Sequence, residues 1–174
     1  MAAITSPSGL PGFSSTTPTR ANRTWALVGL VALCLAVGAI GGLATSAGVR
    51  EWYPTLAKPS WTPPNWVFAP VWTTLYVLMG VAGWLVYRTS AVRSHVAWRI
   101  WWIQLALNAF WSPVFFGAHL VGVAAAIIAA LWLAITWFIV ITWRPQRAAS
   151  RLFLPYWTWV TYASSLNFGI WWMN

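Results

Sequence analysis

Apolar residues gather in five long runs along the chain, separated by shorter segments that carry prolines and arginines. The runs cover residues 25–47, 68–87, 98–117, 120–143 and 152–172. Each has about the 20 residues that a helix needs to cross the hydrocarbon core of a bilayer. Backbone polar groups inside lipid must be bonded within their own segment, so each run is expected to be a helix. The pattern predicts an all-α membrane protein whose residues 25–174 form a five-transmembrane-helix bundle.

The residues before the first run have a different composition. Residues 1–24 are rich in Ser, Thr, Pro and Gly, and no apolar signal-peptide core precedes Arg20 and Arg23. We expect them to form a disordered N-terminal tail rather than a cleavable leader. Only 6% of the 174 residues are charged, whereas a soluble domain has about 25%. The composition therefore agrees with a chain that lies mostly in the bilayer.

The basic residues are distributed unequally between the two sides of the predicted bundle. The net charge is +9, but the cations stand between apolar runs, so we expect them to set topology and not to bind nucleic acid. One side holds Arg20, Arg23, Arg88, Arg93, Arg99, Arg144, Arg147 and Arg151, and the other holds Arg50 and Lys58. This bias predicts a cytoplasmic N-terminus and an outer C-terminus. Long spans and the missing leader favour the inner membrane of a bacterium.

The segment "WYPTLAKPSWTPPNW", residues 52–66, joins the first two runs on the outer side. Its four prolines exclude a long helix, and its bulky aromatic residues are unlike those of a flexible linker. We predict a stiff lid over the bundle, shaped by Lys58, Pro59, Pro63 and Pro64. Trp66 is expected to be an interfacial anchor, and Trp61 is left unassigned.

Three runs carry stripes of aromatic and amide side chains spaced four residues apart, so that each stripe lies on one helix face. The stripes are Phe68, Trp72 and Tyr76; Gln104, Asn108 and Ser112, with Trp111 beside them; and Trp159, Ala163 and Asn167. Each stripe alone would fit ordinary packing between membrane helices. Together, beneath an aromatic lid, they favour an apolar pocket with a few convergent polar groups.

Most of the 17 tryptophans lie near the ends of the runs, as in the aromatic belts of membrane proteins. Trp132 and Trp137 lie deep in the fourth run, where a buried indole needs a partner for its N–H group or lines a cavity. In the first run, Gly38 and Gly42 have the G-x-x-x-G spacing that permits close approach of helices, including dimerisation.

Residues for acid–base or metal chemistry are scarce. Glu51 is the only carboxylate and Cys34 the only cysteine, and His95 and His119 are far apart in sequence. No Ser–His–Asp set can be assembled, and we predict no metal site and no conventional catalytic residues. The chemistry that remains is tryptophan photochemistry or redox chemistry on a bound chromophore.

Three segments together resemble the TspO/MBR family, the translocator or tryptophan-rich sensory proteins. They are "WYPTLAKPSWTPPNWVFAPVWTTLY" (52–76), "QLALNAFWSPVFFG" (104–117) and "LPYWTWVTYASSLNFGIWWMN" (154–174). The resemblance covers residues 25–174. It implies a five-helix bundle, a homodimer, and a cavity that binds protoporphyrin IX, haem and synthetic benzodiazepine or isoquinoline ligands, with no obligatory cofactor. The implied ligand-facing residues are Trp52, Tyr53, Phe68, Trp72, Asn108, Trp111, Trp159 and Ala163.

The functional expectation is a membrane receptor or carrier for tetrapyrroles that acts in tetrapyrrole handling and stress responses. One alternative is light-dependent porphyrin degradation through Trp52 and Trp159. Another is a structural subunit without a small-molecule ligand. The sequence departs from the animal members, since Phe168 and Trp172 replace the Tyr and the basic residue of their cholesterol-recognition pattern, a weak motif in any case. Cholesterol delivery is therefore not carried over to this chain.

Overall fold

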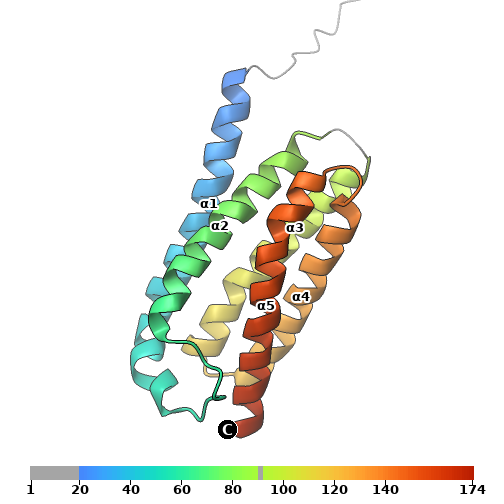
Figure 1. Cartoon of the computed structure of the whole chain (residues 1–174). Helices are drawn as coiled ribbons and strands as arrows, with labels where there is room; N and C mark the ends of the chain where they lie inside the picture. Colours follow the sequence, from blue (N-terminus) through green and yellow to red (C-terminus); the bar gives the residue numbers. More distant parts are fainter. Residues whose placement is uncertain (1–19, 90–91) are drawn as a thin grey trace, which may run out of the picture.

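The computed structural model describes residues 20–89 and 92–174, and five long helices form the bundle (Figure 1). They are α1 (Arg20–Ala47), α2 (Phe68–Tyr87), α3 (Val92–Ser112), α4 (Val121–Thr142) and α5 (Arg147–Met173). Short turns adjoin them: η1 (Gly48–Trp52), η2 (Tyr53–Thr55), η3 (Asn65–Val67) and η4 (Pro113–Gly117). The predicted all-α five-helix bundle is confirmed.

Several helix ends differ from the predicted runs, although α2 coincides with the second run. α1 begins at Arg20, inside the predicted tail, and the remainder of that tail, residues 1–19, lies outside the described residues. α3 and α5 begin earlier than predicted because arginine is a good helix former and continues the helix beyond the apolar run. α3 changes to a π-helical turn at Pro113, which has no N–H group for the regular helical hydrogen bond.

Three helical segments of the described chain are long and apolar enough to cross a bilayer: Thr24–Thr55, Asn65–Tyr87 and Val121–Thr142. α3 and α5 are long enough as well but carry more polar side chains. Four of these, Gln104, Asn108, Ser150 and Asn167, are buried inside the protein. Polar groups that face other helices avoid the cost of exposure to lipid, so these two helices fit a membrane bundle.

The connections divide the bundle into two ends (Figure 1). One end has the α2–α3 and α4–α5 connections, and we call it the closed end. The lid and the C-terminus lie at the opposite end, which we call the cavity end. α4 packs against both α3 and α5, α1 packs mainly on α2, and α2 also contacts α5.

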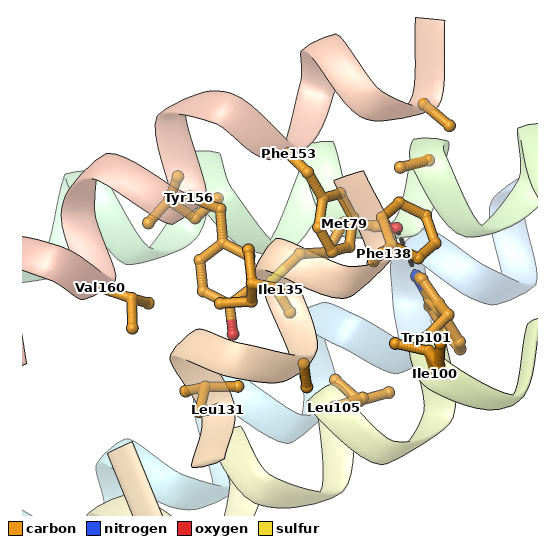
Figure 2. Packing of buried hydrophobic residues seen from close by; sticks show 14 of the residues in the cluster. Met79, Ile100, Trp101, Leu105, Leu131, Ile135, Phe138, Phe153, Tyr156 and Val160 are labelled. Carbon is orange, nitrogen blue, oxygen red and sulfur yellow. Dashed lines mark hydrogen bonds between the residues drawn. The ribbon is translucent and has the colours of Figure 1, made fainter. Parts of the chain in front are cut away.

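Aromatic rings and small residues fill the closed end (Figure 2). The Trp101 indole donates a hydrogen bond to the Met79 carbonyl at 2.9 Å. A Cβ atom on Gly83 would lie 2.5 Å from this indole, so the glycine is what admits the ring. Phe138 and Phe153 stack with ring centroids 4.0 Å apart. Dense interdigitation of this kind is typical of a close-packed protein core.

The two tryptophans predicted in the interior of α4 have different environments. The Trp132 N–H group donates to the Thr161 hydroxyl at 2.8 Å, which supplies the partner that a buried indole needs. Trp137 is 57% exposed and lies on the outer surface of the bundle. Neither residue lines the cavity described below.

Candidate ligand cavity

An interior cavity of about 830 Å³ occupies the cavity end. Its wall comes from α1, α2, α5, the lid-side end of α3 and the short turns η1 to η4, while α4 contributes none of the lining residues. Ligand pockets in proteins have volumes of about 300–1,000 Å³ and mainly apolar walls. The cavity is therefore large enough for a sizeable organic molecule.

Six lining residues are exposed: Arg50 and Asn65 on the lid side, and Ala39, Gly42, Ala69 and Thr73 on α1 and α2. The cavity is therefore open between α1 and α2 as well as on the lid side, and we call the opening at Arg50 and Asn65 the mouth. Arg50 belongs to η1 and Asn65 to η3. The mouth thus lies where the chain leaves α1 and where it returns to α2.

Hydrogen bonds within the wall hold its polar groups in place. The Tyr76 hydroxyl donates to Asn108 Oδ1 at 2.7 Å, and Asn108 Nδ2 donates to the Tyr156 hydroxyl at 3.0 Å. The Trp111 indole donates to Asn167 Oδ1 at 2.9 Å. Since these amides and rings are already partnered within the protein, the wall has a fixed shape and offers little further polar contact.

The amide stripe predicted on α3 is divided between the core and the cavity. Asn108 and Ser112 line the cavity, and the Ser112 hydroxyl lies 3.3 Å from that of Thr45 on α1. Gln104 does not line it and is fully buried, with its Nε2 group bonded to the Trp101 carbonyl at 2.9 Å. Its Oε1 atom has no hydrogen-bond partner among the described residues. The stripe follows one helix face, but the cavity spans only the lid-side part of it.

Seven of the eight residues predicted to face a ligand line the cavity: Tyr53, Phe68, Trp72, Asn108, Trp111, Trp159 and Ala163. Trp52 is not a lining residue. Its indole stacks on the His119 imidazole at 4.1 Å between ring centroids and meets Phe115 edge-on at 5.7 Å. Consecutive residues in a helical turn point in different directions, so burying Tyr53 turns its neighbour Trp52 toward the α3–α4 connection.

Trp159 is distinctive among the wall residues. Its ring meets Phe68 in an edge-on contact at 5.7 Å. Its Nε1 atom is buried and has no hydrogen-bond partner among the described residues. A buried indole N–H is normally partnered, so Trp159 holds an unused donor beside the cavity.

The contribution of α1 to the wall was not predicted. It consists largely of small and aliphatic residues, among them Val37, Gly38, Gly41, Gly42 and Thr45. A Cβ atom on Gly38 would lie 2.2 Å from the Tyr76 ring, whereas one on Gly41 or Gly42 would meet nothing within 4 Å. The G-x-x-x-G pair is therefore divided: Gly38 permits contact with α2 in the same chain, and Gly42 faces open space.

The first turn of the lid, residues 52–66, is closed by hydrogen bonds from its own lysine. Lys58 Nζ donates to the carbonyls of Tyr53, Pro54 and Leu56 at 3.0, 3.2 and 2.9 Å. An ammonium group has three donors, so these bonds use all of them. Lys58 does not line the cavity, and its role is to close the turn at the start of the lid.

Contacts to α5 hold the rest of the lid. Pro59 is buried against Gly169 of α5. A Cβ atom at Gly169 would lie 2.5 Å from the Pro59 ring, so only glycine leaves room for it. The Tyr162 hydroxyl donates to the Trp61 carbonyl at 2.5 Å. The Asn174 side chain accepts from the Ala57 N–H group at 3.1 Å and donates to the Ala57 carbonyl at 3.0 Å.

The last part of the lid leads back into α2. Pro63 is half-buried, and the Pro64 carbonyl accepts a hydrogen bond from the Val67 N–H group at 3.0 Å, which closes η3. Trp66 is exposed, as expected for an interfacial anchor, and Trp61 is exposed as well.

The lining of the cavity is mainly apolar and aromatic. Within residues 20–89 and 92–174, no group of three His, Cys, Asp or Glu side chains could hold a metal ion. His119 lies against Trp52 and is not a lining residue. The apolar wall, the indole rings and the cation at the mouth suit non-covalent binding of an organic molecule.

These features define a multi-span helical membrane protein with an internal cavity under a proline-rich lid. The chain belongs to the TspO/MBR family, whose model matches residues 30–173, and this confirms the resemblance found in the sequence.

Relatives in the family come from both bacteria and animals. The chain is 40% identical over 146 residues to the tryptophan-rich protein TspO of Chlorobaculum tepidum, covering 83% of this chain and 92% of the relative. It is 40% identical over 153 residues to the tryptophan-rich sensory protein of Cereibacter sphaeroides, covering 84% and 90%. It is 35% identical over 147 residues to the translocator protein of Sus scrofa, covering 78% and 84%.

Proposed function

We propose that the protein is a membrane receptor or carrier that binds tetrapyrroles such as protoporphyrin IX or haem in the cavity. The observation that carries the proposal is the cavity of about 830 Å³, whose wall includes the indoles of Trp72, Trp111 and Trp159. Flat aromatic macrocycles gain from offset stacking and edge contacts with such rings. The cavity also suits benzodiazepine and isoquinoline ligands, which are smaller aromatic molecules.

The lid is already ordered, so ligand binding should cost little conformational entropy. Its prolines and its bonds to α5 fix the backbone before a ligand arrives. A site that is preorganised loses less conformational entropy on binding. The proposal therefore includes tight binding under a lid whose backbone is already ordered.

We place the protein in the inner membrane of a bacterium, with the N-terminus in the cytoplasm and the lid outside. The excess of arginine at the closed end supports this orientation through the positive-inside rule. A reporter fused after Asn174 is expected to read as external, and a cytoplasmic signal would contradict the topology. A homodimer in the membrane is part of the proposal, and crosslinking in native membranes tests it.

Titration of the purified protein with protoporphyrin IX in nanodiscs tests the main proposal. We expect saturable quenching of tryptophan fluorescence and a several-fold weaker affinity in Trp159→Phe, because a wall indole is lost. Trp137→Phe changes a tryptophan on the outer surface and serves as the control. The absence of saturable binding in the wild type would favour a purely structural subunit.

Light-dependent degradation of the bound porphyrin is the second candidate, supported by the position of Trp159 at the cavity. It predicts loss of porphyrin absorbance that requires light and oxygen and that disappears in Trp159→Phe. Because Trp52 stacks on His119 outside the lining, Trp52→Phe should affect this reaction less than Trp159→Phe. Stable absorbance under illumination in the wild type would remove this candidate.

A further inference from the structure

The two basic residues on the lid side of the bundle differ in their hydrogen bonding. Lys58 is fully occupied by three carbonyls of its own turn and also lies over the Tyr53 ring, with Nζ 5.1 Å from the centroid. It has no donor left for a ligand unless the turn opens. An acidic ligand group near the lid would therefore gain little from Lys58.

Arg50 has the opposite arrangement. It lies in η1 at the mouth and lines the cavity. Its Nε atom donates to the Ser46 carbonyl one turn earlier, at 3.2 Å. Among the described residues its two Nη groups, which form the end of the guanidinium fork, have no hydrogen-bond partner. One bond thus orients the side chain and leaves the pair of donors that suits a carboxylate.

Acidic side chains are nearly absent from the chain. Glu51 is the only Asp or Glu, and it does not line the cavity. The cavity wall itself contains no acidic side chain, so a cation at its mouth stands beside an apolar, low-dielectric space. Charge–charge attraction is stronger there than in bulk water.

We propose that Arg50 is the anion-binding residue of this cavity, and that the ligand is a flat apolar aromatic molecule with an acidic group on one edge. The inference rests on the proposed function and specifies how the ligand is oriented. The apolar face of the ligand lies against the indole-rich wall. Its carboxylate lies at the mouth and accepts hydrogen bonds from the Nη groups of Arg50. Lys58 acts only as a structural tie of the lid.

A matched pair of ligands isolates the acidic group. Protoporphyrin IX and its dimethyl ester share one macrocycle and differ in the charge of the two propionic side chains. We expect Arg50→Gln to weaken binding of the diacid about tenfold, the usual effect of losing a charge-assisted hydrogen bond, and to leave binding of the ester unchanged. Arg50→Lys keeps the positive charge and loses the paired donors of the guanidinium group. Its affinity for the diacid should lie between those of wild type and Arg50→Gln.

A second basic residue provides the control. Arg144 is exposed at the closed end, so Arg144→Gln removes the same charge at a distance and should alter neither affinity. Equal loss of diacid binding in Arg144→Gln would assign the effect to net charge and overturn the proposal. Loss of acid-over-ester selectivity in Lys58→Gln, with selectivity retained in Arg50→Gln, would overturn it as well.

The outcomes separate the two proposals. If wild type binds both porphyrins and Arg50→Gln changes neither, the tetrapyrrole site stands and the role of Arg50 is refuted. If wild type binds neither porphyrin, the tetrapyrrole proposal fails. The same comparison is then made with an anionic anilinonaphthalene sulfonate dye and the neutral N-phenylnaphthylamine, where retained preference for the anion in Arg50→Gln overturns the role of Arg50.

Discussion

The closed end and the cavity end of the bundle use the same kinds of residue for opposite purposes. At the closed end, glycines allow backbones and rings to touch: a Cβ atom on Gly80 would lie 2.6 Å from the Val31 Cα atom. At the cavity end, Gly38 and Gly169 also admit rings, those of Tyr76 and Pro59, but Gly41 and Gly42 leave open space. Tryptophans follow the same division, since Trp101 fills the core and Trp159 lines the cavity. Residue type alone therefore does not say whether a membrane helix packs or encloses a space.

The largest loss of stability is expected from adding a side chain at the closed end, where the α1 and α2 backbones are in contact. Gly80→Val places atoms against the Val31 backbone, which cannot rotate away as a side chain can. We expect a loss of about 3 kcal/mol in the free energy of unfolding, the upper range for overpacking. Reversible unfolding in mixed detergent micelles measures it.

Gly42→Val is the matched control on α1, and we expect it to stay within about 0.5 kcal/mol of wild type, as substitutions away from close contacts do. Equal losses in the two variants would show that the ends do not differ in packing.

The next effect concerns the Trp101 indole. Trp101→Phe removes the hydrogen bond to the Met79 carbonyl and leaves a small void beside Gly83. The combined loss should be about 2 kcal/mol. The same unfolding measurement applies, with Trp137→Phe on the outer surface as the control. A loss below that of the control would mean that the indole is not a packing element of the closed end.

Filling the cavity should affect binding and leave the fold intact. Gly41→Trp projects an indole into open space, and we expect at least a tenfold loss of protoporphyrin IX affinity, about 1.4 kcal/mol. Gly29→Trp adds the same ring on α1 at an exposed site outside the lining, where a Cβ atom also meets nothing within 4 Å. Comparable affinities in the two variants would place the ligand elsewhere.

The smallest effect is expected at the tie between the lid and α5. Asn174→Ala removes both hydrogen bonds to Ala57, about 1 kcal/mol in total for bonds exposed to solvent. Amide exchange of the lid, followed by mass spectrometry, should then become about fivefold faster. The α4 amides, which form no hydrogen bond with the Asn174 side chain, should exchange at the wild-type rate. Unchanged exchange of the lid would mean that Tyr162 and Gly169 hold it without Asn174.

Much of the fold could be predicted because hydrophobic length marks a membrane helix. The run at residues 68–87 coincides with α2 since prolines before it and arginine after it mark both ends. The starts of α3 and α5 could not be located in this way, because arginine is compatible both with a loop and with a helix that extends beyond the apolar run. The helical periodicity predicted that Trp72, Asn108 and Trp159 face the cavity, since residues four apart share a helix face.

Three features of the site needed the three-dimensional structure. The direction of Trp52 depends on the π-helical turn η1, whose extra residue per turn is not evident in the sequence. The α1 wall carries no aromatic or amide stripe that would mark it, and glycine fits close packing and open space equally well. The different roles of Arg50 and Lys58 likewise depend on which carbonyls each side chain reaches.

The glycines of α1 also bear on how such a protein changes over generations. A mutation at Gly41 or Gly42 alters the shape of the binding space without disturbing a neighbouring side chain. Selection can therefore adjust ligand preference on this helix while the core at the closed end stays intact. The fold and the proposed ligand selectivity are thus expected to vary nearly independently, and libraries randomised at these two positions are a direct route to bundles that bind new aromatic molecules.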